Sequence, residues 1–221
     1  MKIKLFIDLD GTLLQTNKLK KELFDELENQ GFNKLEINKA YAEECQSNNY
    51  TNEGFLKRLE KIKKYDKEKT LDLANRLLLQ ADKFVYKDTI KTLEILSRNP
   101  KYELLLLSLG NETFQALKAK STGLLKYFKK TYFTPVEKYQ YLSNLVETNE
   151  KFIMVDDRAD ALHNIKIHFP NSIVIESNHD GYVTDPSEKE VDFERKKIDK
   201  ISDLLKILWP IILVSISVNK E

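Results

Sequence analysis

Cysteine is almost absent from this chain of 221 residues, which contains only Cys45. One cysteine forms neither an intramolecular disulfide nor a cysteine metal cluster, so a disulfide-stapled secreted domain and a structural zinc site are excluded. This scarcity indicates a reducing compartment, and we expect a cytoplasmic protein. Acidic residues come too early in the N-terminal segment for a signal peptide. We expect Cys45 itself to be inert, away from any functional motif.

An excess of charge of either sign is also missing, because 36 basic residues face 35 acidic ones. Counterion-release binding needs a basic excess on one face, so we expect no nucleic-acid partner. Six glycines and five prolines provide no flexible or stiff linker. Any domain boundary must therefore be found from changes in the hydrophobic pattern.

Long hydrophobic runs are scarce, and the longest occupies residues 207–218. Pro210, Ser215 and Ser217 interrupt it, and it is shorter than the roughly 20 residues of a membrane-spanning helix. We expect no membrane span and interpret this run as a buried terminal element. A peripheral membrane contact and a terminal segment of unusual origin are the alternatives.

Four short apolar runs predict strands that are buried on both faces: Ile3–Ile7, Glu103–Leu107, Phe152–Val155 and Ser172–Ile175. Continuous rather than alternating hydrophobicity is typical of a parallel sheet covered by helices. Helical patterns alternate with these runs, which favours right-handed crossover units and a three-layer α/β fold. The predicted helices of this core are Asp88–Leu96, Glu112–Leu125, Lys138–Val146 and Asp160–Phe169.

The range 15–85 differs from the rest of the chain. Apolar residues recur there at helical spacing, for example Leu19, Leu23 and Leu27, and no strand-like run occurs. We therefore expect an all-helical insertion between the first two core strands. The predicted core domain consists of residues 1–14 and 86–221.

Two carboxylates follow the first predicted strand directly. In an open α/β sheet, ligands bind beyond the carboxyl ends of the strands, and that is where Asp8 and Asp10 lie. Two such acids repel each other unless a cation or a proton relieves them. A divalent metal would keep Asp8 ionised and able to attack phosphorus, while Asp10 could carry a proton to the leaving oxygen. Gly11 allows the sharp turn that brings Asp10 inward.

This stretch, Asp-x-Asp-Gly-Thr after a hydrophobic strand, resembles the first motif of the haloacid dehalogenase superfamily of phosphohydrolases. The resemblance implies a Rossmann-like core, magnesium, and an aspartyl-phosphate intermediate on Asp8. It also implies that Gly11 and Thr12 belong to the substrate-binding turn. The helical insertion matches, in position and size, the cap that closes the site in one branch of this superfamily.

Ser108, at the end of the second strand, is similar to the second motif of the family, a hydroxyl that donates to a phosphoryl oxygen. Gly110 would let backbone amides approach the same oxygens. The N-terminus of the following helix, at Asn111, would favour their negative charge. We therefore expect Gly110 and Asn111 to contact the substrate.

Lys138 lies where the family has its third motif, a lysine at the start of a later helix. Its ammonium would pair with Asp8 and offset the charge that develops on the phosphoryl group. Lysine is abundant in this chain, and Lys129, Lys130 and Lys151 are the alternatives.

The fourth motif follows the third strand, where acids could hold a hard cation through oxygen atoms. The alignment favours Asp157 as the direct ligand, with Asp156 or Asp160 acting in a supporting role. The division of labour among these three acids stays open. The resemblance implies that Asp8 and the carbonyl of Asp10 complete the magnesium site.

The sequence thus predicts a magnesium-dependent phosphohydrolase that acts on a small phosphorylated metabolite. One alternative is a binding or regulatory module that keeps the fold without turnover, and another is a phosphomutase on the same scaffold. Asp10 argues against a dehalogenase, which does not need this acid. The resemblance extends to about Glu176, and residues 177–221 form a C-terminal extension without a family signal. The particular substrate and the oligomeric state are left open.

Overall fold

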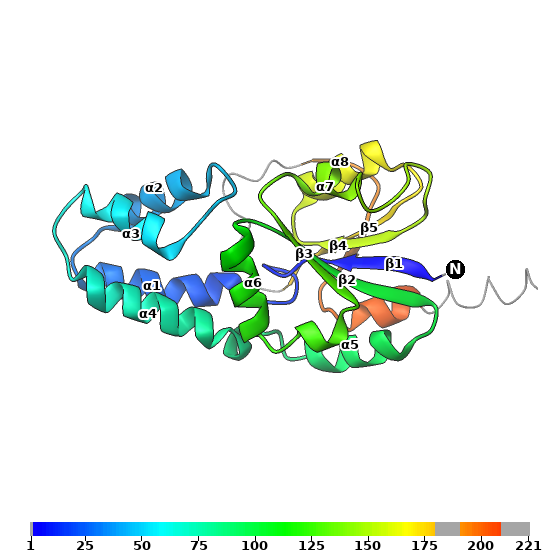
Figure 1. Cartoon of the computed structure of the whole chain (residues 1–221), viewed down its shortest axis with the longest axis horizontal. Coiled ribbons are helices and arrows are strands. Elements are labelled where there is room, and N and C mark those ends of the chain that lie inside the picture. Colours follow the sequence, from blue (N-terminus) through cyan, green and yellow to red (C-terminus); the bar gives the residue numbers. More distant parts are fainter. Residues whose placement is uncertain (1, 180–190, 209–221) are drawn as a thin grey trace, which may run out of the picture.

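A six-stranded parallel sheet forms the centre of the molecule (Figure 1). The computed structural model describes residues 2–179 and 191–208. The strands run in the order β3-β2-β1-β4-β5-β6, and each neighbouring pair is parallel. The α/β prediction is therefore confirmed. The strands are β1 (Ile3–Ile7), β2 (Tyr102–Leu109), β3 (Lys130–Thr134), β4 (Ile153–Asp156), β5 (Ile173–Ser177) and β6 (Lys196–Ile198).

The central strands are mostly apolar, with exceptions such as Lys4 and Glu103 near their N-terminal ends, because both faces of the sheet are covered. Successive side chains of a strand point to opposite faces. Leu5 and Ile7 accordingly belong to one hydrophobic cluster, while Phe6, between them, belongs to the other. All three side chains are fully buried, which explains why the apolar runs of the sequence are continuous.

Helices pack on both faces of the sheet (Figure 1). Helix α5 (Thr89–Arg98) and the helical residues 203–208 cover the face that contains Leu5 and Ile7. Helices α7 (Lys138–Leu142) and α8 (Ala159–His168) cover the opposite face. Helix α6 (Glu112–Ser121) lies beside β3, and the 3-10 helix Leu125–Tyr127 follows it.

The two strands that the sequence pattern did not predict, β3 and β6, are the edges of the sheet. An edge strand is paired on one side only, and lysines are common there because they discourage further strand pairing. Lys130 begins β3, and Lys196 and Lys197 begin β6. These polar residues break the continuous hydrophobicity that identified the other four strands.

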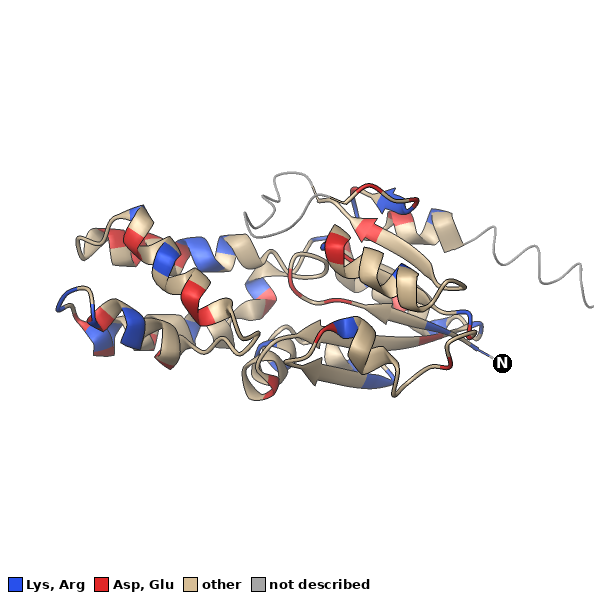
Figure 2. Cartoon of the chain, turned by 90° about the horizontal axis from the view of Figure 1, so that it is seen from above, with Lys and Arg blue, Asp and Glu red and all other residues tan. Residues whose placement is uncertain are grey.

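Helices make up the insertion between β1 and α5. Residues 16–84, all of which the structure describes, contain helices and no strand. Basic and acidic residues are interspersed along these helices, so neither sign dominates (Figure 2). The helices are α1 (Thr16–Asn29), α2 (Lys34–Cys45), α3 (Asn52–Glu60), α4 (Lys67–Leu79) and the 3-10 helix Ala81–Phe84.

Side-chain caps define where three of these helices begin. Asn33 and Glu36 form a reciprocal capping box at the start of α2. The side chain of Thr51 accepts a hydrogen bond at the start of α3, and that of Asp66 does so at the start of α4. Each cap satisfies a backbone N–H that has no partner within its helix.

The insertion leaves and rejoins the core at one place. Leu14 and Val85 form an antiparallel bridge, and the N–H of Gln15 donates to the carbonyl of Phe84 at 2.7 Å. Leu14 itself pairs with Asp10, so both ends of the insertion lie next to the suspected site. The treatment of residues 15–85 as a separate domain stays a prediction.

The end of the chain is described only in part. Most of the apolar run at 207–218, interpreted above as a buried terminal element, lies outside the described residues. Leu208 is buried, and its carbonyl accepts a hydrogen bond from the hydroxyl of Tyr102 at 3.1 Å. In the described ranges 2–179 and 191–208, no helix has the length and apolar character needed to cross a membrane.

Candidate active site

A cavity of about 240 Å³ lies between the carboxyl ends of the central strands and the helices of the insertion. Strand β1 leads into Asp8, whose N–H donates to the carbonyl of Val155 at 2.9 Å and so continues the sheet pairing. Polar side chains from the ends of β1, β2 and β4 and from α7 meet where the cavity borders the sheet. The predicted residues that line it are Asp8, Asp10, Ser108, Gly110, Asn111, Lys138, Asp156 and Asp157.

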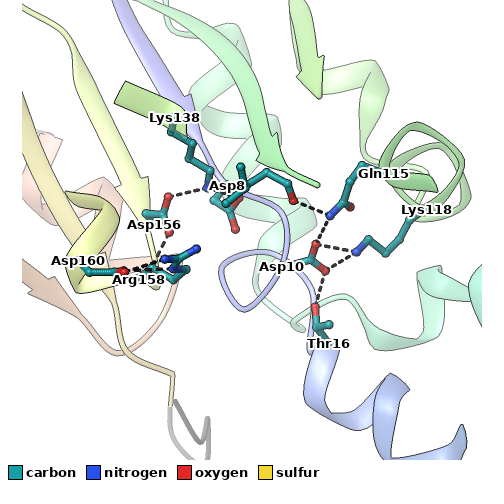
Figure 3. A network of polar contacts seen from close by, with 10 residues as sticks. Asp8, Asp10, Thr16, Gln115, Lys118, Lys138, Asp156, Arg158 and Asp160 are labelled. Atoms are coloured by element: carbon teal, nitrogen blue, oxygen red, sulfur yellow. Dashed lines mark hydrogen bonds and ion pairs between the residues drawn. The ribbon is translucent and has the colours of Figure 1, made fainter. Parts of the chain in front are cut away.

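Lys138 lies between two buried carboxylates (Figure 3). Its Nζ atom is 2.5 Å from Oδ1 of Asp8 and 2.6 Å from Oδ2 of Asp156. It is the first residue of α7, and that helix directs it toward the end of β1. The alternative lysines, Lys129, Lys130 and Lys151, are exposed, so Lys138 is the lysine of this site.

The buried carboxylates of this cluster carry more negative charge than Lys138 neutralises. Burial raises the pKa of Asp8 to about 7; Lys138 opposes this shift, and the charges of Asp156 and Asp10 add to it. Burial lowers the pKa of Lys138, but Asp156 and Asp8 outweigh that effect, and the net shift is upward. One lysine therefore does not neutralise the acids around it, and a further cation or a proton is needed.

Asp8, Asp156 and Asp157 form a group that could hold a metal ion, because each offers an oxygen atom within 4.8 Å of the others. The two oxygens of Asp156 already accept hydrogen bonds, at 2.6 Å from Lys138 and at 3.0 Å from the N–H of Arg158. Asp8 and Asp157 are thus the better candidates for direct ligands. A donor set made only of oxygen suits a hard cation such as magnesium.

Asp160 has a different partner. Its carboxylate binds Arg158 through two contacts, at 2.7 and 3.1 Å (Figure 3). Among the described residues, Asp160 is not part of the group of acids that could hold a metal ion. The pair with Arg158 instead fixes the loop that follows β4, on which Asp157 lies.

Ser108 supplies a hydroxyl without a partner. It is 1% exposed, it lines the cavity, and its Oγ atom has no hydrogen-bond partner among the described residues. A buried hydroxyl that is left unpaired costs free energy. A phosphoryl oxygen beside Asp8 would satisfy it.

Gly11 and Thr12 are not among the described residues that line the cavity, and their assignment to substrate binding stays a prediction. Gly11 has φ 73° and donates its N–H to the carbonyl of Leu14 at 2.9 Å, which closes the turn after Asp10. The carbonyl of Thr12 lies 2.9 Å from Nε2 of His179. Both residues shape the turn instead of touching the cavity.

Gly110 and Asn111 line the cavity, but their hydrogen bonds differ from the expectation. The N–H of Gly110 donates to the carbonyl of Thr134 at 2.7 Å, so this amide is not offered to a phosphoryl oxygen. Asn111 caps α6 by accepting from the N–H of Phe114 at 2.9 Å, and its Nδ2 donates to Asn49 at 2.6 Å. Asn111 thus connects the core with the insertion.

Asp10 is held by side chains that the sequence did not single out (Figure 3). Lys118 contacts both of its oxygens, at 2.6 and 2.7 Å, Thr16 donates to it at 2.6 Å, and Gln115 donates to it at 3.0 Å. Burial alone would raise the pKa of Asp10, but the charge and hydrogen bonds of Lys118, with those of Thr16 and Gln115, lower it. Asp10 is therefore held as a carboxylate.

Cys45 lies at the cavity, contrary to the expectation that it is remote from the functional motifs. It is at the C-terminal end of α2, next to Tyr41, whose hydroxyl it contacts through a hydrogen bond. The sequence pattern could not reveal this because α2 was not among the helical patterns singled out. Cys45 belongs to the wall that the insertion contributes.

Residues 5–161 match the family model described as "haloacid dehalogenase-like hydrolase". The match covers most of the chain and contains every acid, the serine and the lysine of the site. The chain belongs to the haloacid dehalogenase-like hydrolases. A comparison with curated protein sequences gave no match.

Solved structures of this family share the fold. A haloacid dehalogenase-like hydrolase from Burkholderia xenovorans is similar with a TM-score of 0.73 and 20% identity, covering 93% of this chain and 96% of that one. L-2-haloacid dehalogenase from Xanthobacter autotrophicus gives 0.68 and 13%, with coverage of 95% and 99%. The HAD hydrolase YfnB from Bacillus subtilis, bound to magnesium, gives 0.64 and 15%, with coverage of 94% and 98%.

Proposed function

We propose that this hydrolase is a magnesium-dependent phosphatase that forms an aspartyl-phosphate intermediate on Asp8. The observation that carries the proposal is the setting of Asp8, which lies 2.5 Å from Lys138 and shares a cavity with the unpaired hydroxyl of Ser108. A carboxylate nucleophile, a cation and a neutral donor around one point suit a phosphoryl group.

In the first step, an oxygen of Asp8 attacks phosphorus in line, and the bond from phosphorus to the leaving oxygen breaks. Lys138 and Ser108 hold the phosphoryl oxygens, and Lys138 offsets the charge that develops on them. Lys118 holds Asp10 as a carboxylate in the free protein, so Asp10 must first take up a proton as the negatively charged phosphate binds beside it, and it then gives that proton to the leaving alcohol.

In the second step, water attacks the phosphoryl group on Asp8, and Asp10 accepts a proton from that water. Lys118 favours the carboxylate form of Asp10, which is the form that this step requires. Inorganic phosphate leaves, and Asp8 is free again. The same acid thus donates in one step and accepts in the other.

Magnesium fits the donor set of this site. Asp8 and Asp157 would hold it, with the carbonyl of Asp10, while Asp156 orients Lys138. When bound, the cation supplies positive charge that screens the carboxylates from one another and from the incoming phosphate. The presence of magnesium in YfnB supports this choice of metal by analogy.

The substrate of this proposal is a small phosphorylated metabolite, whose size suits a cavity of about 240 Å³. The insertion would act as a cap that shields the cavity from water. A cytoplasmic location stays a prediction from the single cysteine.

The test is the release of phosphate from p-nitrophenyl phosphate, with and without magnesium, between pH 5 and 9. We expect turnover that depends on magnesium and that disappears in Asp8→Asn, while the circular dichroism spectrum stays unchanged. Asp72→Asn is the matched control, because Asp72 is an exposed residue of α4.

Three outcomes would contradict the proposal. No metal-dependent release at any pH would favour a binding or regulatory module. Transfer of phosphate within a sugar phosphate, without net release, would indicate a phosphomutase. Chloride release from 2-chloropropionate, without release of phosphate from the ester, would indicate a dehalogenase.

A further inference from the structure

The cavity has two chemically different ends. The acids, the serine and the lysine lie where the strands and α7 border the cavity, whereas residues of α1 and α4, with Phe114 of α6, supply much of the remaining lining. Its apolar side chains are Leu19, Leu23, Ala74, Leu77, Leu78 and Phe114.

The polar side chains of the insertion that line the cavity already have partners. Asn52 accepts from the hydroxyl of Tyr50 at 3.3 Å and donates to Asn75 at 3.3 Å. Asn48 donates to Glu137 at 3.4 Å, and Asn17 also has an interaction. A sugar ring needs many donors and acceptors around its hydroxyls, and it would have to compete with these existing hydrogen bonds.

The tyrosines that the insertion contributes to the wall are uncharged. Burial raises the pKa of Tyr41 and that of Tyr50, and nearby groups including Cys45 add to the shift, so both phenols are neutral. Lys20 places its ammonium 4.8 Å from the ring of Tyr41, which provides a cation–π contact. The wall therefore offers aromatic and aliphatic surface more than ionic partners.

We propose that the preferred substrate is a phosphate monoester whose leaving alcohol carries a compact apolar body, such as a short alkyl chain or a single ring. The phosphate lies at Asp8 and Ser108, and the apolar body extends toward Leu77 and Leu78 of α4. A sugar or a nucleoside would bring hydroxyls against this wall and leave them without partners. The inference rests on the phosphatase function proposed above.

Leu78 is the residue that tests the contact most directly. It is buried and lines the cavity, yet it belongs to neither hydrophobic cluster formed by the described residues. A change there alters the cavity wall with less effect on the core. Leu79, the next residue of α4, is 59% exposed and does not line the cavity, so it serves as the matched control.

The experiment compares kcat/KM for benzyl phosphate, glycerol 3-phosphate and glucose 6-phosphate, with magnesium present. All three are esters of primary alcohols, so differences between their leaving groups are small. We expect benzyl phosphate to be preferred by about tenfold or more, since each apolar group placed in such a pocket contributes a factor of this order. A preference for glycerol 3-phosphate or glucose 6-phosphate would overturn the inference and leave the phosphatase function standing.

Substitution of the wall is the second arm of the experiment. Leu78→Asn should lower kcat/KM for benzyl phosphate by about tenfold and leave glycerol 3-phosphate within about twofold, whereas Leu79→Asn should change neither. An equal loss on both substrates would show that Leu78 does not contact the leaving group, and would overturn the inference. Failure to hydrolyse any ester, p-nitrophenyl phosphate included, would instead overturn the phosphatase function itself.

Discussion

Lys118 binds both carboxylate oxygens of Asp10, at 2.6 and 2.7 Å, although the two residues are 108 positions apart in the sequence. The lysine is buried, and its ammonium reaches Asp10 from α6 (Figure 3). Gln115, on the same helix, donates to Asp10 and to the carbonyl of Leu109. Helix α6 therefore fixes the position of the proposed acid and base.

The first prediction concerns Lys118→Met, which keeps much of the side-chain volume and removes the charge. Without its partner, Asp10 loses its fixed position, and we expect kcat for p-nitrophenyl phosphate to fall by about tenfold or more, with little change in KM. Lys118→Arg should restore part of kcat, because it can still bind both oxygens. Steady-state kinetics at several pH values provide the measurement.

Lys120→Met is the control for this change, since Lys120 is exposed on the same helix. It should leave kcat unchanged. If Lys118→Met lowered only the thermal stability and kept wild-type kcat, Lys118 would be a structural residue with no part in positioning Asp10.

The second prediction concerns Lys138→Met. Lys138 is the cation between Asp8 and Asp156, and its removal leaves two buried carboxylates facing each other. Breaking a buried ion pair in this way costs about 3 kcal/mol of folding free energy. Urea unfolding should show this loss without metal, and magnesium should recover part of it by screening the same acids. A loss that magnesium does not change would argue against a metal site at these residues.

The third prediction is a pH dependence of stability that arises from Asp8. Its pKa is about 7 in the folded protein and near 3.8 ordinarily, so the folded state holds this proton to a higher pH than the unfolded chain does. Between these two values the folded state binds more protons, and stability falls as the pH rises. Relative to Asp8→Asn, the wild type should lose up to about 4 kcal/mol between pH 4 and pH 8.

Urea unfolding of both proteins without metal, at pH 5 and pH 8, measures this difference. The substitution should stabilise the protein at pH 8 and have less effect at pH 5. Magnesium should reduce the effect, since a bound cation favours the ionised carboxylate. Parallel pH profiles for the two proteins would mean that Asp8 does not titrate in this range.

The central strands and their terminal residues could be predicted because burial on both faces produces continuous apolar runs. Ile3–Ile7 has the same bounds in the sequence pattern and in the structure. Since parallel strands end at the same edge, the pattern also brought Asp8, Ser108 and Asp156 together. The edge strands β3 and β6 were missed because they carry lysines and lack such runs.

The partners of Asp10 could not be predicted from the sequence. The helical pattern located α6, but it did not tell which of its residues face the turn after β1. Gln115 and Lys118 are polar, and polar residues of a helix usually face solvent. Their burial depends on the way in which α6 packs between β3 and α4, which is a tertiary feature.

The last prediction separates the two roles of Asn111, which caps α6 and also binds Asn49 of the insertion. Asn111→Ala removes both contacts and should lower the free energy of unfolding by about 1 kcal/mol, mainly through the lost cap. Asn111→Asp can still cap the helix, so it should retain most of the stability while losing the donor to Asn49. If Asn111 mainly links core and insertion, Asn111→Asp should raise KM while its stability stays near that of the wild type. Thermal unfolding measures the stability, and steady-state kinetics measure KM. Equal stability loss in the two variants would show that the link to Asn49, and not the cap, stabilises the fold.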